Sequence, residues 1–446
     1  MAAETQHEPL TDAEADRLLS SFANADGLGL AVSGGPDSVA LMRLVAGWRV
    51  RQCPDLPVIV LTVDHGLRPE AAAEARQVAT WARDCGLTHR TLHWEGHKPV
   101  ADIQAAARTA RYRLMADACA NAGLSHLLTA HHLDDQAETL LLRLARGSGV
   151  DGLSAMPEAA RWPGLLLARP FIDVPRGRLA ATLAALGQPW IDDPSNDNPK
   201  FARVRLRSMM PSLAAEGMTA RRLAETAKRM RRARAALETM AADLHRTAVT
   251  EDMAGFCRVD LAAFGSAPEE IGLRVLARLL MGIGGSDYPP RLECLERLYD
   301  AVLDDTRSGG GATLCGCRIV RSGTALIVFR ETGRTGLPVQ PVNPAGTLVW
   351  DRRFRIDAAC DVVGSGLQVR ALGEEGVKRV RENSSLRIIP VEAARVSPGI
   401  FDGDRLIAAP LVEDRAGGMA GGPYSPPEFA IAFTGRSRFA GAPDGM

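Results

Sequence analysis

The sequence is poor in lysine. Only four of its 53 basic residues are lysine and the other 49 are arginine, the side chain best shaped to bind phosphate through two hydrogen bonds. A Walker-type nucleotide loop needs Gly-Lys-Ser or Gly-Lys-Thr, and no lysine here follows a glycine, which excludes that class of ATPase and kinase. The four lysines are Lys98, Lys200, Lys228 and Lys378.

The sequence also lacks a CxxC pair, an export signal and a long apolar run. Its eight cysteines are scattered, as in proteins of a reducing compartment. Cys315 and Cys317 would share one face of a strand, but two thiols without a second pair are more often small buried hydrophobes than zinc ligands. The segment before Leu19 is polar and acidic rather than basic and apolar. A cytoplasmic location is therefore expected.

The first two hundred residues predict an α/β fold. Short β-rich runs at 28–32, 58–63, 91–94 and 126–130 alternate with amphipathic stretches, which is typical of a doubly wound, mostly parallel sheet. With 446 residues, 46% hydrophobic and 24% charged, the chain is too long for one core. We expect a catalytic domain over 1–210, a mainly helical domain over 211–331, a small C-terminal α+β domain over 346–420 and a disordered tail over 421–446.

Strand-like segments are expected in the later domains as well. Two of them, Cys317–Val320 and Ala325–Phe329, follow a Gly-rich turn, and the stretch 332–346, rich in Gly and Pro, is expected to be a linker. Three more are expected in the C-terminal domain, at 348–356, 367–372 and 406–411.

A serine-flanked glycine pair stands between the first strand and the first helix of the sheet. The six residues are Ser33, Gly34, Gly35, Pro36, Asp37 and Ser38. Adjacent glycines let the backbone come close to a bound group, and the helix that follows directs free N–H groups to the same place. The loop therefore predicts an anion site, most plausibly for a nucleotide phosphate, although a serine-capped turn has a similar pattern. Asp37 would repel a triphosphate unless a divalent cation lay between them, which predicts Mg²⁺ at this residue.

Two more polar clusters follow strands of the same sheet. Asp64 ends the second strand, and the fourth strand runs into the block 131–139, His-His-Leu-Asp-Asp-Gln-Ala-Glu-Thr. Ligands of such sheets bind beyond the carboxyl ends of the strands, so these clusters should meet the glycine loop there. Asp135 and Glu138 are three residues apart on one helical face, where two carboxylates favour a metal or an ammonium group. The alternative is an acid-rich first helical turn exposed to solvent.

Arginines gather in three places. Arg108 and Arg111 are three apart on a predicted helix, and Arg203, Arg205 and Arg207 alternate along what we expect to be an extended segment, where all three would face one way. A predicted helix over 221–234 carries six further arginines and one lysine. These side chains either bind phosphates or form solvated faces.

In this order, these segments resemble the tRNA(Ile)-lysidine synthetases, a family of the N-type ATP pyrophosphatase, or PP-loop, superfamily. The resemblance is close over about 20–210. The Ser-Gly-Gly-x-Asp-Ser loop indicates the superfamily alone. The family is indicated by the 131–139 block, Arg-Gly-Ser-Gly at 146–149 with Gly-Leu at 152–153, Arg-Pro at 169–170, and Asp-x-Ser-Asn at 193–196 ahead of the arginines. The resemblance implies a Rossmann-like PP-loop domain and looser similarity from residue 211 onward.

The resemblance also implies a ligase reaction that uses ATP and Mg²⁺ to join free L-lysine to C2 of the wobble cytidine in isoleucine tRNA with a CAU anticodon. Cytosine O2 attacks the α-phosphate and releases pyrophosphate, and the lysine amine then displaces AMP. Residues 33–38 would bind ATP with Asp64 near its nucleoside end, Asp37 would hold magnesium, and Asp135 with Glu138 would bind lysine and take its proton. The RNA would be held by Arg203, Arg205, Arg207 and the 221–234 helix, with Arg108 and Arg111 nearer the cytidine.

Three rival functions share parts of this pattern. A tRNA thiolase would use the same loop, but sulfur transfer calls for a reactive cysteine pair or an iron–sulfur cluster, and the only close cysteines, Cys315 and Cys317, are far along the chain from the loop. An amidotransferase-type synthetase would need a glutaminase domain, for which no region remains. An inactive RNA-binding scaffold could dispense with Asp37, Asp135 and Glu138, and all three are present.

Overall fold

The structure is a computed structural model that describes residues 7–66, 69–96, 98, 103–162, 164–192, 199–304, 311–359, 366–383, 387, 389–412 and 429–435. The chain forms two compact units that divide between Ala235 and Ala236, inside the long helix α9 (Ala220–Ala248). The start of α9 packs in the first unit through Leu223 and Ala227, and its end packs in the second through residues such as Leu244.

A six-stranded sheet forms the centre of the first unit. Its order is β3-β2-β1-β4-β6-β5, and every neighbouring pair is parallel except β5 with β6. The chain leaves β1 to its two sides, because both β2 and β4 pair with it. The segments that follow β1 and β4 therefore begin side by side, at a point where the strand order reverses. The strands are β1 (Leu28–Ala31), β2 (Val58–Asp64), β3 (Thr88–His93), β4 (His126–Leu128), β5 (Ala159–Trp162) and β6 (Leu165–Ala168).

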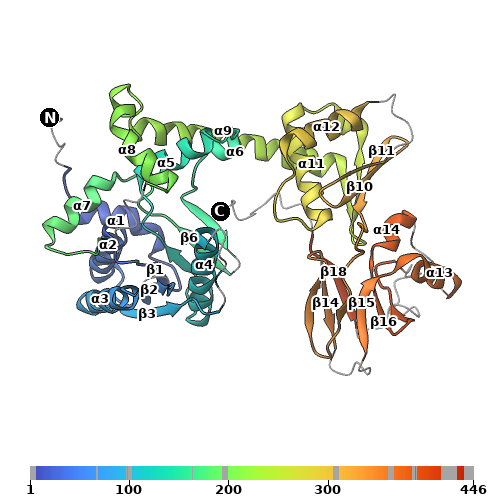
Figure 1. The fold of residues 1–446 in the computed structure, drawn as a ribbon, viewed down its shortest axis with the longest axis horizontal. Coiled ribbons are helices and arrows are strands. Elements are labelled where there is room, and N and C mark those ends of the chain that lie inside the picture. Colours follow the sequence, from blue (N-terminus) through green and yellow to red (C-terminus); the bar gives the residue numbers. More distant parts are fainter. Residues whose placement is uncertain are drawn as a thin grey trace. The chain divides into compact units, whose positions relative to one another are not determined.

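Helices cover both faces of this sheet (Figure 1). Along β2, Val58 and Val60 belong to a core shared with α1, α2, α3 and α7, whereas Ile59 and Leu61 pack with α4 on the opposite face. The expected doubly wound, mostly parallel sheet is thus confirmed. The helices of this unit are α1 (Asp12–Leu19), α2 (Pro36–Gln52), α3 (Ala71–Asp84), α4 (Ile103–Asn121), α5 (Leu133–Leu144), α6 (Val150–Leu153), α7 (Arg176–Ala185) and α8 (Ala202–Ala215), with the short 3-10 turn η1 (Ser20–Phe22).

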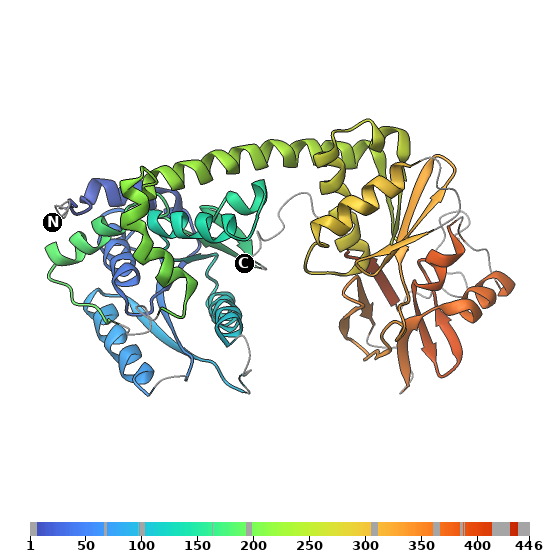
Figure 2. The ribbon, with the colours of Figure 1, turned by 45° about the horizontal axis from the view of Figure 1, so that its top comes forward.

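The second unit begins with a five-stranded sheet of order β7-β8-β11-β10-β9. Helix α11 packs on this sheet and α12 packs on α11, as Figure 2 shows. The expected strands at 317–320 and 325–329 are present as an antiparallel pair. The elements are β7 (Val249–Asp252), β8 (Phe256–Asp260), α10 (Leu261–Gly265), α11 (Glu269–Gly284), α12 (Leu292–Leu303), β9 (Ala312–Leu314), β10 (Cys317–Ser322) and β11 (Ala325–Arg330).

Two smaller sheets complete the second unit, with orders β12-β15-β16-β17 and β13-β14-β18. One hydrophobic cluster runs from the five-stranded sheet into both of them, so the described part of the second unit shares one core. The elements are β12 (Gln340–Pro341), β13 (Thr347–Trp350), β14 (Phe354–Ala358), β15 (Leu367–Ala371), α13 (Gly373–Asn383), α14 (Val391–Arg395), β16 (Pro398–Asp402), β17 (Arg405–Ala408) and β18 (Phe429–Phe433).

The structure differs from the sequence expectations in three places. The boundary expected after residue 210 falls inside α8. The single strand expected over 348–356 is a hairpin, because Asp351 and Arg352 adopt left-handed backbone conformations and turn the chain. Within the expected tail, Phe429 and Phe433 are buried and β18 pairs with β14, so this stretch contributes to the core. The division into three domains stays a prediction.

Within the described ranges, no helix combines the length and the apolar character that crossing a bilayer requires.

Candidate active site

The loop between β1 and α2 is held open by glycine. Gly34 has a φ of +94°, and a Cβ atom there would lie 2.6 Å from Ile191 Cδ1. The Ile191 N–H donates to the Gly34 carbonyl at 2.9 Å, and the Ser38 hydroxyl accepts from the Ser33 N–H at 3.2 Å. Helix α2 starts from Gly35 without a side-chain cap. Its N-terminal N–H groups are therefore left for a ligand, as an anion site requires.

His132 joins this loop to the acidic helix α5. It precedes α5 as the N-cap, where its Nδ1 accepts from the Asp135 N–H at 3.3 Å while the Asp135 carboxylate accepts from the His132 N–H at 3.1 Å. An accepting Nδ1 places the ring hydrogen on Nε2. That nitrogen lies 3.4 Å from Asp135 Oδ2 and 3.6 Å from Asp37 Oδ2. The two acids that the sequence placed in separate motifs thus share one imidazole.

The charged groups around the His132 imidazole shift the pKa values of both His132 and Asp37. Burial opposes the charged form of His132, but the hydrogen bond to Asp37 and the carboxylates of Asp135, Asp37 and Asp134 prevail and raise its pKa. Burial also opposes the charged form of Asp37, yet the His132 hydrogen bond and the charges of His132, Arg176 and Arg207 lower its pKa. Asp37 is therefore a carboxylate that cations of the protein already face.

Glu138 lies one turn further along α5 and is buried, with 2% of its surface exposed. Its Oε1 accepts from Arg207 Nε at 2.8 Å. Its Oε2 is buried and has no hydrogen-bond partner among the described residues. Leaving a buried carboxylate oxygen unsatisfied costs stability, which marks this atom as the place for a cationic or hydrogen-bond-donating ligand.

The arginines expected on an extended segment lie on helix α8, so the expectation that all three face one way is wrong. On a helix, residues four apart share a face and the residue midway between them points elsewhere. Arg203 and Arg207 accordingly face α5, where Arg203 donates to the Thr139 hydroxyl at 3.4 Å. Arg205 donates instead to the carbonyls of Pro199 and Lys200.

Arg108 and Arg111 on α4 flank the ring of Tyr112, with guanidinium carbons 5.1 and 5.2 Å from its centroid. The positive charges of Arg108 and Arg111 also disfavour the protonated form of His131. Burial together with the charges of Arg169, Arg108, Arg111 and Arg203 holds the pKa of His131 well below its usual value. The charges of the expected RNA-binding residues of α4 and of Arg203 on α8 thus act on the same histidine.

Asp64 closes its own turn. Its Oδ1 accepts from the Gly66 N–H at 2.8 Å and its Oδ2 lies 3.7 Å from His93 Nδ1. These contacts fit a structural residue at the end of β2.

Gln136, between the two acids on α5, is buried and binds the backbone of Met156 from both sides. Its amide donates to the Met156 carbonyl at 2.7 Å and accepts from the Met156 N–H at 2.8 Å. Arg231 on α9 donates to the same carbonyl at 2.8 Å. The acidic helix is therefore anchored to the loop before β5, and that loop to α9.

Sequence reasoning assigned no role to two residues of this site, His132 and Arg176. His132 could have been found from its place directly before an acidic first helical turn, which is where an N-cap stands. Arg176 has no local signal. It reaches the loop because its N–H donates to Asp134 at 2.8 Å, which brings Arg176 Nε within 3.7 Å of Asp37 Oδ1.

The described residues contain no cluster of three His, Cys, Asp or Glu side chains that could hold a metal by itself. Mg²⁺ is commonly bound by one or two carboxylates together with substrate phosphates, so Asp37 beside an anion-binding loop fits that ion.

The thiol of Cys317 is buried against the Leu280 carbonyl at 3.3 Å. The Asp193–Asn196 motif lies outside the described residues.

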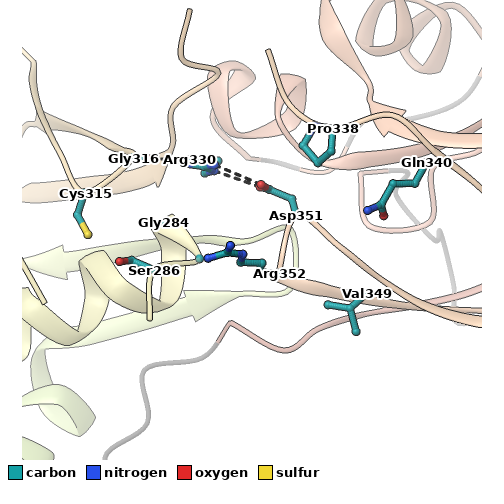
Figure 3. A pocket seen from close by; sticks show the side chains of 11 residues that line it. Gly284, Ser286, Cys315, Gly316, Arg330, Pro338, Gln340, Val349, Asp351 and Arg352 are labelled. Atoms are coloured by element: carbon teal, nitrogen blue, oxygen red, sulfur yellow. Dashed lines mark hydrogen bonds and ion pairs between the residues drawn. The ribbon is translucent and has the colours of Figure 1, made fainter. Parts of the chain in front are cut away.

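The second unit contains a cavity of about 520 Å³, shown in Figure 3. Backbone from the end of α11, the β9–β10 turn and the β13–β14 turn lines it, with the ion pair between Arg330 and Asp351 at its wall. Arg353, next in the chain after this wall, is completely buried and also pairs with Asp351, at 2.7 Å.

The comparisons with known proteins agree with this geometry. The PP-loop domain family matches residues 8–213, which contain both the Ser33–Ser38 loop and α5. A solved U34-tRNA thiolase from Methanococcus maripaludis is 15% identical over 49% of this chain and 78% of its own, with a TM-score of 0.42.

Curated relatives cover far more of the chain. The tRNA(Ile)-lysidine synthase of a Bradyrhizobium strain is 49% identical over 68% of this chain and 86% of its own length, and that of Rhodopseudomonas palustris is 47% identical over 74% and 98%. The tRNA(Ile)-lysidine synthase of Ruegeria pomeroyi is 38% identical over 86% of this chain and 88% of its own. Identity at this level extends well beyond the PP-loop domain, and with it the chain belongs to the tRNA(Ile)-lysidine synthase family.

Proposed function

We propose that this protein joins free L-lysine to C2 of the wobble cytidine in isoleucine tRNA with a CAU anticodon, at the expense of ATP. Membership of the tRNA(Ile)-lysidine synthase family supports this reaction. The observation that carries it in the structure is the adjacency of two unlike sites: a phosphate-sized loop after β1 and paired acids after β4, joined by His132. A triphosphate and an amine can thus be bound next to each other.

In the first step, cytosine O2 attacks the α-phosphate of ATP, and pyrophosphate leaves. The Ser33–Ser38 loop and the start of α2 bind the phosphates through backbone N–H groups and hydroxyls, so catalysis is mainly positioning and charge neutralisation. Asp37 would hold Mg²⁺, and the ion would neutralise the charge that develops on the phosphates. His132 and Arg176 keep Asp37 ionised and oriented.

In the second step, the lysine ε-amine attacks C2 of the adenylated base and AMP leaves with the oxygen. The unsatisfied Oε2 of Glu138 offers the ammonium a buried acceptor, and Asp135 adds a second carboxylate on the same helix. An unperturbed lysine amine has a pKa of about 10.4, so the site must both bind the ammonium and remove its proton.

The RNA is held mainly through its phosphates. The charges of Arg108, Arg111 and Arg203 all act on His131, and these arginines suit contacts close to the target cytidine. Arg205, exposed on the far side of α8, and the arginines of α9 suit backbone contacts further away. Arg207, expected from the sequence to bind RNA, is bonded to Glu138, and its contact with RNA stays a prediction. A cytoplasmic location fits a tRNA substrate and stays a prediction.

Incubation with ATP, Mg²⁺, radiolabelled lysine and tRNA bearing a CAU anticodon tests the proposal. We expect lysine label in the RNA, with AMP and pyrophosphate formed in equal amounts, and no label in a control tRNA with uridine at the wobble position. Asp37→Asn should lower pyrophosphate release about a thousandfold, because charge placement supplies most of this step. Incorporation of sulfide would favour a thiolase, and tRNA binding without any ATP cleavage would favour a scaffold.

A further inference from the structure

Glu138 has two carboxylate oxygens with different surroundings. Arg207 occupies Oε1, while Oε2 is buried and has no partner among the described residues. Arg207 does not need Glu138 as a counter-charge, because 40% of its side chain is exposed and water can solvate the guanidinium. If the proposed function holds, the lysine ammonium binds at Oε2. One buried carboxylate then faces two cations, and one of them is a permanent part of the protein.

The other charged groups nearby are already engaged. Asp37 on α2 and Asp135 on α5 face His132, although their charges also act on Arg207, and on α8 Arg203 turns to Thr139. Helix α6 also packs on α5, and its Asp151 pairs with Arg234. Arg207 therefore stands as the cation that shares Glu138 with the substrate. Its charge is fixed at any pH at which the enzyme works, because a guanidinium does not lose its proton there.

We propose that Arg207 activates the lysine amine by sharing Glu138 with it, which disfavours the ammonium form at the point where the free amine is needed. A positive neighbour lowers the pKa of an amine, and lysines next to a second cation are known nucleophiles for this reason. Glu138 alone would have the opposite effect: it would bind the ammonium tightly and keep it protonated. The pair combines a carboxylate that attracts the amine with a guanidinium that keeps it deprotonated.

The chemical step balances without another reactant. The ammonium first gives one proton to solvent or to Asp135. The amine nitrogen then forms a bond to C2, the C2–O2 bond breaks, and AMP leaves with that oxygen and the electron pair. The nitrogen gives up a second proton after the bond forms. Free lysine at pH 7.5 is about one part in a thousand neutral, so lowering its pKa by one to two units raises the reactive fraction about ten- to a hundredfold.

The test is the pH dependence of the lysine step in wild type, Arg207→Gln and Arg207→Lys, measured with labelled lysine and tRNA after the cytidine has been adenylated. We expect the wild-type rate to level off one to two pH units below the pKa of free lysine. In Arg207→Gln, kcat at pH 7.5 should fall about ten- to a hundredfold, the pH limb should move up by one to two units, and KM for lysine should fall. Arg207→Lys keeps the charge and should retain the wild-type limb.

Two comparisons separate this role from others. S-(2-aminoethyl)cysteine, whose amine is less basic than that of lysine, should react with Arg207→Gln better than lysine does. Arg113→Gln removes an exposed arginine of α4 that pairs with Asp117 and does not contact Glu138, and it should leave the pH limb in place. An unmoved limb in Arg207→Gln, or a wild-type limb at the pKa of free lysine, overturns the proposal, and the wild-type measurement stands even if a variant fails to fold. Absence of any lysine product from wild type at every pH would instead overturn the proposed function.

Discussion

Two buried carboxylates, one in each unit, are paired with arginine in opposite ways. In the first unit, Glu138 has one oxygen bonded to Arg207 and a second with no partner among the described residues. In the second, Asp351 is bonded to both Arg330 and Arg353, so its two oxygens are used. The surplus there is positive, because Nη1 and Nη2 of the buried Arg353 have no partner in the described part of the chain.

The difference separates a binding site from a structural pair. Both oxygens of Asp351 already accept hydrogen bonds from arginines, so the carboxylate has no free acceptor for a ligand. Its ion pairs hold the β13–β14 turn, where Asp351 and Arg352 have left-handed backbone conformations that cost about 1 kcal/mol or more each. Burial lowers the pKa of Arg353 to about 10, even against Asp351. Glu138, in contrast, has one carboxylate oxygen without a partner among the described residues, and its arginine, Arg207, is exposed enough to be solvated without it. Loss of Asp351 should therefore affect folding, and loss of Glu138 should affect chemistry.

The largest expected effect is that of Asp351→Asn. Asparagine tolerates the left-handed backbone, so the substitution removes charge while sparing the turn. It leaves Arg353 buried without a counter-charge, and we expect a loss of about 3–5 kcal/mol in the free energy of unfolding, measured by urea denaturation. Asp287→Asn, which removes the exposed partner of Arg352, should cost less than about 1 kcal/mol. Equal effects of the two substitutions would contradict the structural role of Asp351.

Glu138→Gln should have the reverse profile. We expect KM for lysine to rise about ten- to a hundredfold with pyrophosphate release unchanged, because the amine loses its buried acceptor while the ATP loop is untouched. The free energy of unfolding should change by less than about 1 kcal/mol, since Arg207 is solvated once released. Glu225→Gln, on an exposed pair of α9, is the matched control for loss of a carboxylate. An unchanged lysine dependence in Glu138→Gln would show that the amine binds elsewhere.

The smallest expected effect concerns the adjacent histidines His131 and His132, which should change the stability of the fold in opposite pH ranges. The pKa of His132 is raised in the folded state, so its contribution to stability is complete below about pH 6.5 and is lost as the pH rises through the folded value. The pKa of His131 is lowered, so its contribution is present above about pH 6.5 and is lost as the pH falls. Unfolding by urea between pH 5 and 9 should show His132→Asn flattening the alkaline limb and His131→Asn the acid limb. Identical curves would contradict this assignment.

The central strands of the first unit could be predicted from the sequence, because β1, β2 and β4 are short apolar runs that local composition reveals. The adjacency of Asp37 and Asp135 also followed, since parallel strands direct both segments to one edge. Arg203 to Arg207 could not be placed, because arginines at every second position are compatible with a strand or with a helix. The β13–β14 turn was hidden because Asp351-Arg352 contains neither Gly nor Asn.

The remaining parts of the site depend on contacts distant in sequence. Arg176 faces Asp37 because of where α7 begins, and Arg207 faces Glu138 because α8 packs on α5. No local pattern encodes either approach. The β18 strand could not be predicted for the same reason, since its partner β14 lies some seventy residues earlier in the chain.

The Met156 carbonyl oxygen has a consequence for the whole chain. It accepts hydrogen bonds from Gln136, which stands between Asp135 and Glu138, and from Arg231, near the point where α9 passes into the second unit. An axial shift of α9 by one turn would carry the Arg231 guanidinium about 5 Å from this oxygen and deprive the acidic helix of part of its support. Through a single atom, the register of the helix common to both units sets how firmly the acidic helix α5 is held.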